Sequence, residues 1–167
     1  NKAVYEAAAE MNALTGMGTT LVCVLITPKS IYSANVGDSR MYLINPSGIK
    51  QITRDHSYVQ YLVNIGRISP QKAKKSSHRN IITRAIGTEN EVEADVYTIK
   101  RRGEAASFAL LCTDGLTNMI EPSEIAAVLN KKDKPDADFL KEAAEKFVKL
   151  ANERGGPDNI TVIIISF

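Results

Sequence analysis

An apolar run that ends at an acidic residue and a glycine constrains the fold of this chain more than any other feature. Segment 110–118 reads LLCTDGLTN, so a strand-like run leads directly into Asp114 and Gly115. Because burying a charge is costly, a buried strand that stops at a carboxylate indicates a group beyond its end that attracts negative oxygen. Segments 35–40 and 155–161 place Asp38 and Asp158 in the same way. The three aspartates predict one shared site.

The composition predicts one globular domain over residues 1–167. A chain of 167 residues is long enough to bury about two-thirds of the surface that its unfolded form exposes. Hydrophobic residues make up 44% and charged residues 24%, and no low-complexity tract or linker divides the sequence. The net charge of +2 is too small to indicate nucleic acid or a membrane surface as a partner.

Neither the cysteines nor the apolar runs indicate secretion or a membrane span. Cys23 and Cys112 lie in apolar runs outside any CxxC motif, where a free cysteine behaves as a small hydrophobic residue. The sequence shows no signal-peptide pattern, and no apolar run approaches the roughly 18 residues of a membrane helix. We therefore expect a cytoplasmic protein. The chain opens without methionine and inside a helical pattern, as though its natural beginning lay upstream.

Hydrophobic periodicity and turn residues predict short strands early in the chain and paired helices late. The expected strands are 19–27 (buried on both faces), 31–36, 41–44, 49–53, 92–100, 107–113 and 160–167. The expected helices are 3–14, 58–65, 71–75, 122–129 and 137–153, with a turn at 102–104. The strands before residue 54 are joined by hairpin-length links, which predicts a meander. This order indicates an α+β fold with antiparallel sheets rather than alternating βαβ units.

Carboxylates are the metal ligands that this sequence offers. With only His56 and His78 as histidines, the sequence disfavours a Cys/His zinc site and a Ser-His-Asp triad. Mg²⁺ and Mn²⁺ take one or two carboxylates each, and two such ions activate water and offset charge on a transferring phosphoryl group. Asp-Gly and Asp-Asn are also common turn sequences, so the residues alone leave a turn role open for Asp38, Asp114 and Asp158.

Six motifs follow one another along nearly the whole chain. They are GMGTT at 16–20, NVGDSR at 35–40, TRDHS at 53–57, RNIITRAIG at 79–87, TDGLT at 113–117 and GPDNIT at 156–161. In this order they resemble the metal-dependent protein phosphatases of the type 2C family, in its bacterial branch. The resemblance implies an antiparallel β-sandwich flanked by helix pairs, in α-β-β-α layers. It also implies hydrolysis of phosphoserine and phosphothreonine in proteins by water activated at a Mn²⁺ or Mg²⁺ pair.

The same resemblance assigns roles to individual positions. Asp114 and Asp158 would bind the paired metals, and Asp38 would bind a third metal seen in bacterial members. Neighbouring residues that would support these ligands are Gly115, Asn159 and Ser39. Residues 58–79 would form a flap beside the active site, with candidate substrate contacts at Lys72, Lys74, His78 and Arg79; a solvated helical surface is the alternative. His56, Arg40 and Arg84 are expected to make internal hydrogen bonds and salt bridges.

The family pattern also includes motifs that this sequence lacks. Family members carry a phosphate-binding arginine, an Asn-Glu-Asp motif and an Asp-Gly-Met-Gly-Gly-His motif, whose aspartate bridges the metals and whose histidine is a candidate general acid. Gly16-Met17-Gly18 has no aspartate before it and cannot replace that motif. The resemblance therefore predicts an incomplete catalytic domain without its N-terminal strands, inactive or impaired alone, with exposed sheet edges that favour self-association.

Three functions remain open at this stage. The first is a metal-dependent serine/threonine phosphatase, for which the expected partners are phosphorylated proteins, including a serine/threonine kinase and its targets. The second is a non-catalytic phosphoprotein-binding module with the same fold, and the sequence upstream of Asn1 would distinguish the two. The third, a Ca²⁺-binding structural domain, is disfavoured because the chain has no EF-hand loop.

Overall fold

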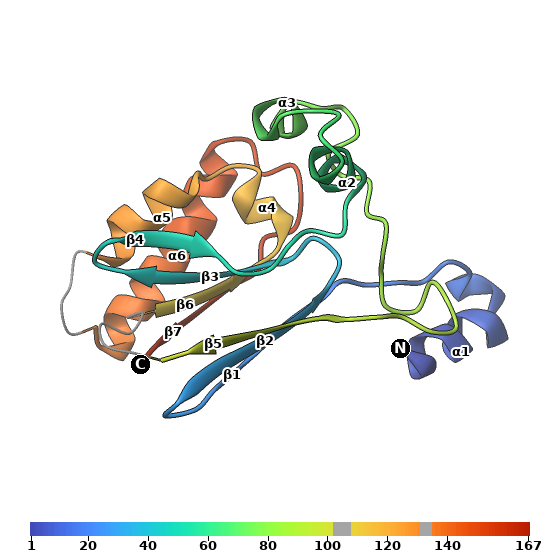
Figure 1. The fold of residues 1–167 in the computed structure, drawn as a ribbon, viewed down its shortest axis with the longest axis horizontal. Helices are drawn as coiled ribbons and strands as arrows, with labels where there is room; N and C mark the ends of the chain where they lie inside the picture. Colours follow the sequence, from blue (N-terminus) through green and yellow to red (C-terminus); the bar gives the residue numbers. More distant parts are fainter. Residues whose placement is uncertain (102–107, 131–134) are drawn as a thin grey trace. The chain divides into compact units, whose positions relative to one another are not determined.

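The computed structural model describes residues 1–101, 108–130 and 135–167, and its described elements form a mixed α+β fold (Figure 1). The strands are β1 Leu21–Ile26, β2 Ser30–Val36, β3 Arg40–Asn45, β4 Gly48–Gln51, β5 Asp95–Lys100, β6 Phe108–Cys112 and β7 Val162–Ser166. The helices are α1 Lys2–Glu10, the 3₁₀ helix η1 Asn12–Leu14, α2 Tyr58–Asn64, α3 Pro70–Lys74, α4 Asp114–Thr117, α5 Pro122–Leu129 and α6 Ala137–Glu153.

The strands form two sheets, one with the order β1-β2-β5 and one with the order β4-β3-β6-β7. In the second sheet, each of the three strand pairs is antiparallel. The predicted α+β class with antiparallel sheets is confirmed. The turn predicted at 102–104 lies outside the described residues.

The contacts divide the chain into two compact units, which we describe separately. The first unit contains Asn1–Val22, Ala34–Ser39 and Arg54–Val96, and the second contains Cys23–Ser33, Arg40–Thr53 and Tyr97–Phe167. The first unit holds α1 to α3, whereas the second holds the whole four-stranded sheet together with α4 to α6. A single domain over residues 1–167 stays a prediction.

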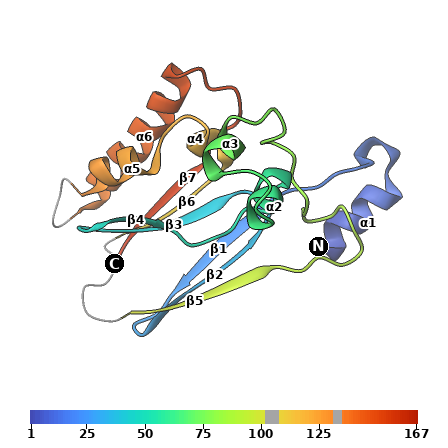
Figure 2. The ribbon, with the colours of Figure 1, turned by 45° about the horizontal axis from the view of Figure 1, so that its top comes forward.

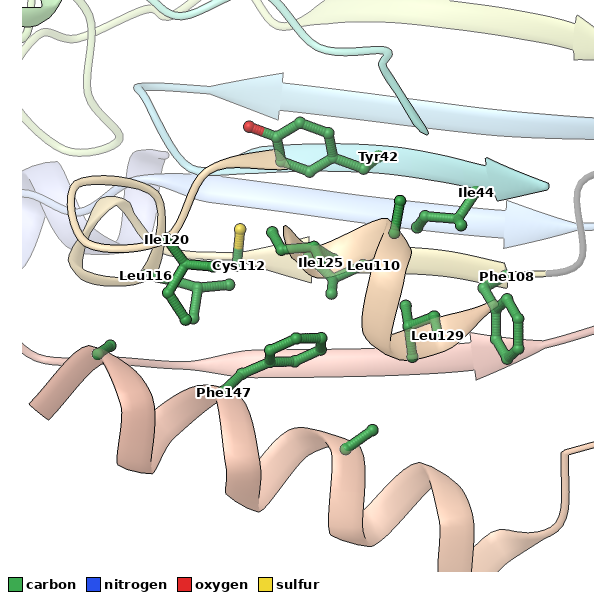
Figure 3. Packing of buried hydrophobic residues seen from close by; sticks show 13 residues of the cluster. Tyr42, Ile44, Phe108, Leu110, Cys112, Leu116, Ile120, Ile125, Leu129 and Phe147 are labelled. Atoms are coloured by element: carbon green, nitrogen blue, oxygen red, sulfur yellow. The ribbon is translucent and has the colours of Figure 1, made fainter. Parts of the chain in front are cut away.

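The core of the second unit lies between the four-stranded sheet and two helices. Figures 1 and 2 show α5 and α6 on the same face of the sheet, where α5 contacts β3 and β4 and α6 contacts β7. Every residue of β6 is buried, as expected for a central strand. Figure 3 shows Phe147 of α6 pointing toward the sheet, within a cluster that includes Tyr42, Ile44, Phe108, Leu110, Leu116, Ile120, Ile125 and Leu129.

Local sequence signals explain where α5 and α6 begin. Glu121 and Glu124 form a reciprocal capping box at α5, and the Asp136 side chain accepts a hydrogen bond from the Phe139 N–H at the start of α6. Arg154, which caps the end of α6, holds both carboxylate oxygens of Glu124 at 2.6 and 2.8 Å. This hydrogen-bonded arginine lowers the pKa of Glu124 to about 2. The two helices are thus tied together at one end.

The first unit carries the predicted surface excursion at 58–79 as two short helices. Ser57 caps α2 and Ser69 caps α3, and each side chain accepts a backbone N–H from the residue three positions on. Helices predicted at 58–65 and 71–75 are thus confirmed to within a residue at each end. The predicted role of this segment as a flap is a matter of function and stays a prediction.

Three predictions about the early part of the chain are wrong. β1 is not buried on both faces, because Leu21 is 51% and Leu25 is 62% exposed, and Cys23 is exposed as well. The strands before residue 54 do not form one meander, because β2 and β3 belong to different sheets. The first helix ends at Glu10, since Met11 adopts an extended conformation, and only the short η1 follows. The apolar content of these segments does not show which strand faces are exposed, which sheet a strand joins or where the first helix ends.

Candidate metal centre

The second unit brings Asp114 and Asp158 to neighbouring strand ends. β6 and β7 pair with Cys112 opposite Val162, so the chain leaves β6 beside the point where it enters β7. Thr113 joins the two segments: its hydroxyl donates to the Asn159 carbonyl at 3.2 Å and accepts from the Thr161 N–H at 3.0 Å. Asp114 is then the first residue of α4. The short helix α4 was not predicted, because four residues carry too little periodicity.

Gly115 allows the two segments to approach closely. A Cβ atom at this position would overlap the carbonyl oxygen of Asn159 and lie 3.0 Å from its carbonyl carbon. A glycine is therefore required here for space rather than for an unusual backbone conformation. The predicted support of the metal ligands by Gly115 and Asn159 stays a prediction.

The electrostatics of Asp114 show that the two carboxylates lie near each other. Burial raises the pKa of Asp114, and the negative charge of Asp158 raises it further. The Gly115 N–H, the Asn118 amide at 3.1 Å and the positive charge of Arg40 oppose this rise without cancelling it. Asp158 is exposed and accepts a hydrogen bond from the Asn159 N–H at 2.7 Å. Burial and the neighbouring carboxylate thus both disfavour the charged form of Asp114.

Such a pair fits a divalent cation, because the added positive charge would offset both the burial of the Asp114 anion and its repulsion by Asp158. No group of three His, Cys, Asp or Glu side chains that could hold a metal ion occurs among the described residues. Asp114 and Asp158 supply two carboxylates, and Mg²⁺ or Mn²⁺ usually keeps several waters as further ligands.

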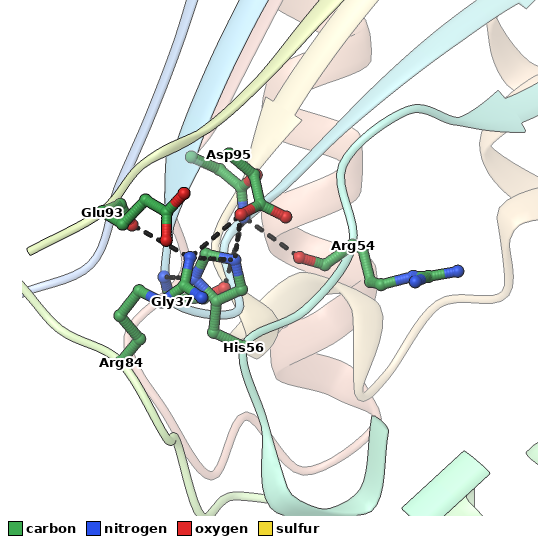
Figure 4. A network of polar contacts seen from close by, with 7 residues as sticks. Gly37, Arg54, His56, Arg84, Glu93 and Asp95 are labelled. Carbon is green, nitrogen blue, oxygen red and sulfur yellow. Dashed lines mark hydrogen bonds and ion pairs between the residues drawn. The ribbon is translucent and has the colours of Figure 1, made fainter. Parts of the chain in front are cut away.

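Asp38 belongs to the first unit and follows a firmly held backbone segment. Figure 4 shows the network around the preceding residue, Gly37. The Gly37 N–H donates to Nδ1 of His56 at 3.1 Å, and the His56 N–H donates to the Gly37 carbonyl at 2.9 Å. Gly37 has a φ of 102°, and a Cβ there would overlap the Thr20 side chain. The backbone before Asp38 is thus fixed by His56 and requires glycine.

His56 is a buried hydrogen-bonding residue, as predicted. Its Nδ1 accepts from the Gly37 N–H, and its Nε2 lies 3.3 Å from the Asp95 carboxylate and 3.2 Å from Nη1 of Arg84. Arg84 completes this network by donating to the same Asp95 oxygen at 2.9 Å and to the Glu93 carbonyl at 2.9 Å (Figure 4). The predicted internal salt bridge of Arg84 is confirmed.

The other predicted site residues also lie in the first unit. Ser39 is buried, and its hydroxyl lies 2.8 Å from the hydroxyl of Thr20, so it links two of the sequence motifs. Lys72 and Lys74 are exposed on α3, and His78 and Arg79 are exposed in the segment that follows it. The ring of His78 packs edge-on against Tyr58, with centroids 6.1 Å apart. Substrate contact by these four residues stays a prediction.

Two residues at the aspartate pair were not predicted there. Asn118 binds the Asp114 carboxylate, and its spacing of four residues within a helix could have indicated this contact. Arg40 lies opposite Cys112 across the β3–β6 pair, which places its charge near Asp114. The register between two strands about 70 residues apart is a tertiary feature, so the local sequence carries no signal for it.

We expect Gly115→Ala to weaken Mn²⁺ binding by about 10- to 100-fold, because the added methyl group would displace the backbone of Asn159 and with it Asp158. Alanine favours helices more than glycine does, so the local helix itself should not be weakened. Isothermal titration with Mn²⁺ measures the effect. Thr117→Ala on the same helix is the control, and equal binding by both variants would show that the close approach has no role in the site.

Solved structures similar to this chain include bacterial serine/threonine phosphatases. The structure of serine/threonine phosphatase Stp1 from Staphylococcus aureus matches with a TM-score of 0.90 and 38% identity, covering 99% of this chain and 62% of that one. The Mycobacterium tuberculosis phosphatase PstP/Ppp matches with a TM-score of 0.84 and 34% identity, covering 98% of this chain and 66% of that one. The class that the fold defines is thus the bacterial protein phosphatases.

Sequence comparison assigns the family. The family model of protein phosphatase 2C matches residues 2–160, and the chain belongs to this family. The serine/threonine phosphatase stp of Listeria welshimeri is 41% identical over 162 residues, which are 97% of this chain and 61% of the relative. Protein phosphatase PhpP of Streptococcus pneumoniae is 43% identical over 155 residues, 92% of this chain and 60% of the relative. The chain thus spans about three-fifths of the length of these relatives.

Proposed function

We propose that the protein to which this chain belongs hydrolyses phosphoserine and phosphothreonine in proteins with the help of Mn²⁺ or Mg²⁺. The observation that carries the proposal is the position of Asp114 and Asp158 at the ends of two antiparallel strands, where burial and the charge of Asp158 raise the pKa of Asp114. Relatives named as serine/threonine phosphatases support the same reaction.

In this proposal, Asp114 and Asp158 would hold the two metals, and Asp38 would hold a third. When bound, such ions supply a nucleophilic water at neutral pH and offset charge on the phosphoryl group. The chain's own residues orient the ligands: Asn118 and the Gly115 N–H fix the Asp114 carboxylate, and the Asn159 N–H fixes that of Asp158. His56 holds the backbone before Asp38.

We further propose that this chain by itself binds metal weakly and has little phosphatase activity. The support is that the Asp-Gly-Met-Gly-Gly-His motif of the family does not occur in this sequence, and that the chain spans 61% of the Listeria welshimeri relative. Ligands from the part of the relatives that this chain does not match would then be needed for turnover. The proposal for the chain alone is separate from the proposal for the whole protein.

A chimera tests both proposals. The part of the Listeria welshimeri relative that this chain does not match is fused to the chain, and phosphate release from a phosphothreonine peptide is measured during titration with Mn²⁺. We expect turnover by the chimera, little turnover by the chain alone, and loss of turnover in the chimera with Asp158→Asn. A folded, inactive chimera that still binds phosphopeptides would instead favour a non-catalytic phosphoprotein-binding module.

The remaining partners belong to the same proposal. Phosphorylated proteins, including a serine/threonine kinase and its targets, are the proposed substrates, and the cytoplasm is the proposed location. None of the described helices has the length and apolar character of a membrane span.

We also propose self-association of the isolated chain, because β1 and β5 are edge strands with exposed Leu25 and Val96. A monomer in light scattering at high concentration would contradict it.

A further inference from the structure

At Thr113 the chain changes from strand β6 to helix α4, and the backbone of this residue takes part in both. Its N–H donates to the Thr161 carbonyl at 3.2 Å, as in a continuing strand pair, whereas its carbonyl accepts from the Leu116 N–H at 3.2 Å, as in a helical turn. In a hydrogen-bonded antiparallel pair, each residue normally donates to and accepts from the residue opposite. The Thr113 carbonyl follows the helix instead, and another acceptor takes the Thr161 N–H.

The hydroxyl of Thr113 is that acceptor. It accepts from the Thr161 N–H at 3.0 Å and donates to the Asn159 carbonyl at 3.2 Å. A threonine immediately before a helix usually caps it, because its hydroxyl accepts a backbone N–H two or three residues on. Thr113 occupies this position of α4, yet within the described residues its side chain makes no such hydrogen bond. The hydroxyl thus gives up a local role and holds a segment 46 to 48 residues away in the sequence.

The segment that Thr113 holds carries the second aspartate of the candidate metal centre. Asn159 follows Asp158 directly, and its N–H donates to the Asp158 carboxylate at 2.7 Å. The Asn159 carbonyl accepts from the Thr113 hydroxyl, and Gly115 leaves space for the same carbonyl, because a Cβ at Gly115 would overlap it. This one carbonyl is therefore positioned by the residues before and after Asp114. All of these residues belong to the second unit.

We propose that Thr113 is a positioning residue whose hydroxyl sets the separation of the Asp114 and Asp158 carboxylates, and that this fixed separation makes the site favour Mg²⁺ over Ca²⁺. The proposal rests on the proposed function, since it takes the two aspartates as metal ligands. Ca²⁺ accepts flexible geometry with oxygen ligands at about 2.3–2.6 Å, whereas Mg²⁺ requires a near-octahedral arrangement at about 2.0–2.1 Å. A fixed pair of carboxylates discriminates between these cations better than a mobile pair does.

A purely structural role of Thr113 is the alternative. Its hydroxyl would then only close the end of the β6–β7 pair with two hydrogen bonds that stabilise the sheet. Removing the hydroxyl would lower the stability of the chain, but the folded chain would bind each cation as before. The two roles therefore differ in the cation affinities of the folded chain and in their ratio.

Three variants separate these roles. Thr113→Val keeps the shape of the side chain and removes both hydrogen bonds of the hydroxyl. Thr113→Ser keeps the hydroxyl and loses the methyl group. Thr117→Val is the matched control, because it makes the same chemical change at the other end of α4. Circular dichroism establishes the temperature range in which each variant is folded, and the cation affinities are measured within that range.

Mn²⁺ is titrated into the 167-residue chain, and the free ion is followed by electron paramagnetic resonance; Mg²⁺ or Ca²⁺ is then added to displace it. We expect Thr113→Val to weaken Mn²⁺ binding by about 10-fold and to reduce the preference for Mg²⁺ over Ca²⁺ by about threefold or more. Thr113→Ser and Thr117→Val should stay within about twofold of the natural sequence in both quantities.

Amide hydrogen exchange checks the geometry in the metal-free chain. Thr113→Val should speed the exchange of the Thr161 N–H, and Thr113→Ser should not, because only the first variant removes its acceptor. Faster exchange in Thr113→Val with unchanged cation affinities would show that the contact is structural alone, and would overturn the proposal. Equal cation affinities of the valine and serine variants would overturn it as well, because the hydroxyl would then not be responsible.

Asp114→Asn distinguishes failure of this proposal from failure of the proposed function. If Asp114→Asn weakens Mn²⁺ binding and Thr113→Val does not, the positioning role is wrong and the metal site stands. If neither substitution changes Mn²⁺ binding, or if the natural sequence does not bind Mn²⁺ at all, the aspartate pair is not the metal site, and both proposals are wrong.

Discussion

Asp114→Asn is expected to have opposite effects on metal binding and on the stability of the metal-free chain. The substitution removes a proposed metal ligand, so the affinity for Mn²⁺ should fall by about 100-fold or more, beyond the roughly 10- to 100-fold that changes around a ligand produce. Removing the charge also ends its repulsion by Asp158 and its burial as an anion. The metal-free variant should therefore unfold at a higher temperature than the natural sequence at pH 7.

The sign of the pH dependence follows from the raised pKa of Asp114. A carboxyl group whose pKa is higher in the folded state stabilises the fold fully only below its unfolded pKa of about 3.9. That contribution is lost as the pH rises through the folded value. The stability advantage of Asp114→Asn should thus be small at acidic pH and should grow toward neutral pH.

Thermal unfolding measured from pH 4 to pH 8, with a chelator or with Mn²⁺, tests this prediction. Mn²⁺ should raise the unfolding temperature of the natural sequence much more than that of Asp114→Asn, because a ligand stabilises only the state that binds it. Asp138→Asn, which removes an exposed carboxylate from the first turn of α6, is the control. Equal stabilisation of both variants by Mn²⁺ would exclude Asp114 as a ligand.

Phe147→Ala is expected to lower the free energy of unfolding by about 3–5 kcal/mol, the usual cost of truncating a buried phenylalanine. Phe147 is fully buried, and it packs from α6 into the cluster of the second unit (Figure 3). Because a typical domain is stable by only about 5–15 kcal/mol, a loss of this size would remove a large share of the total stability.

Urea denaturation followed by circular dichroism measures the loss. The midpoint temperature should also fall by about 2–4 °C for each kcal/mol in a protein of this size. Lys146→Ala is the matched control, since it changes the adjacent, exposed position of the same helix. A loss below about 1 kcal/mol for Phe147→Ala would mean that the cluster does not stabilise the fold as its burial implies.

Strong local signals led to correct predictions. Helix α6 begins and ends where the sequence predicts, because Asp136 caps it and its apolar residues recur at helical spacing. The hairpins around Pro28 and Pro46 were also predicted, because turn residues interrupt the apolar runs on each side. The shared site of Asp38, Asp114 and Asp158 stays a prediction; within the second unit, the charge of Asp158 contributes to the raised pKa of Asp114.

Other features depended on contacts between distant residues. An apolar run predicts a strand, but the exposure of its faces depends on what packs against it, and β1 is therefore half exposed. The change of sheet between β2 and β3 occurs at Gly37, where Thr20 and His56 hold a backbone with positive φ. No local pattern records either partner.

The sequence alone determined the family, the α+β class and the acidic residues at the strand ends, because motifs, periodicity and turn residues are local properties of the chain. Only the tertiary structure decided that Arg40 accompanies Asp114, that His56 holds Gly37, and that α2 exposes Tyr61. These features depend on strand register and packing, which bring together residues that are far apart in the sequence.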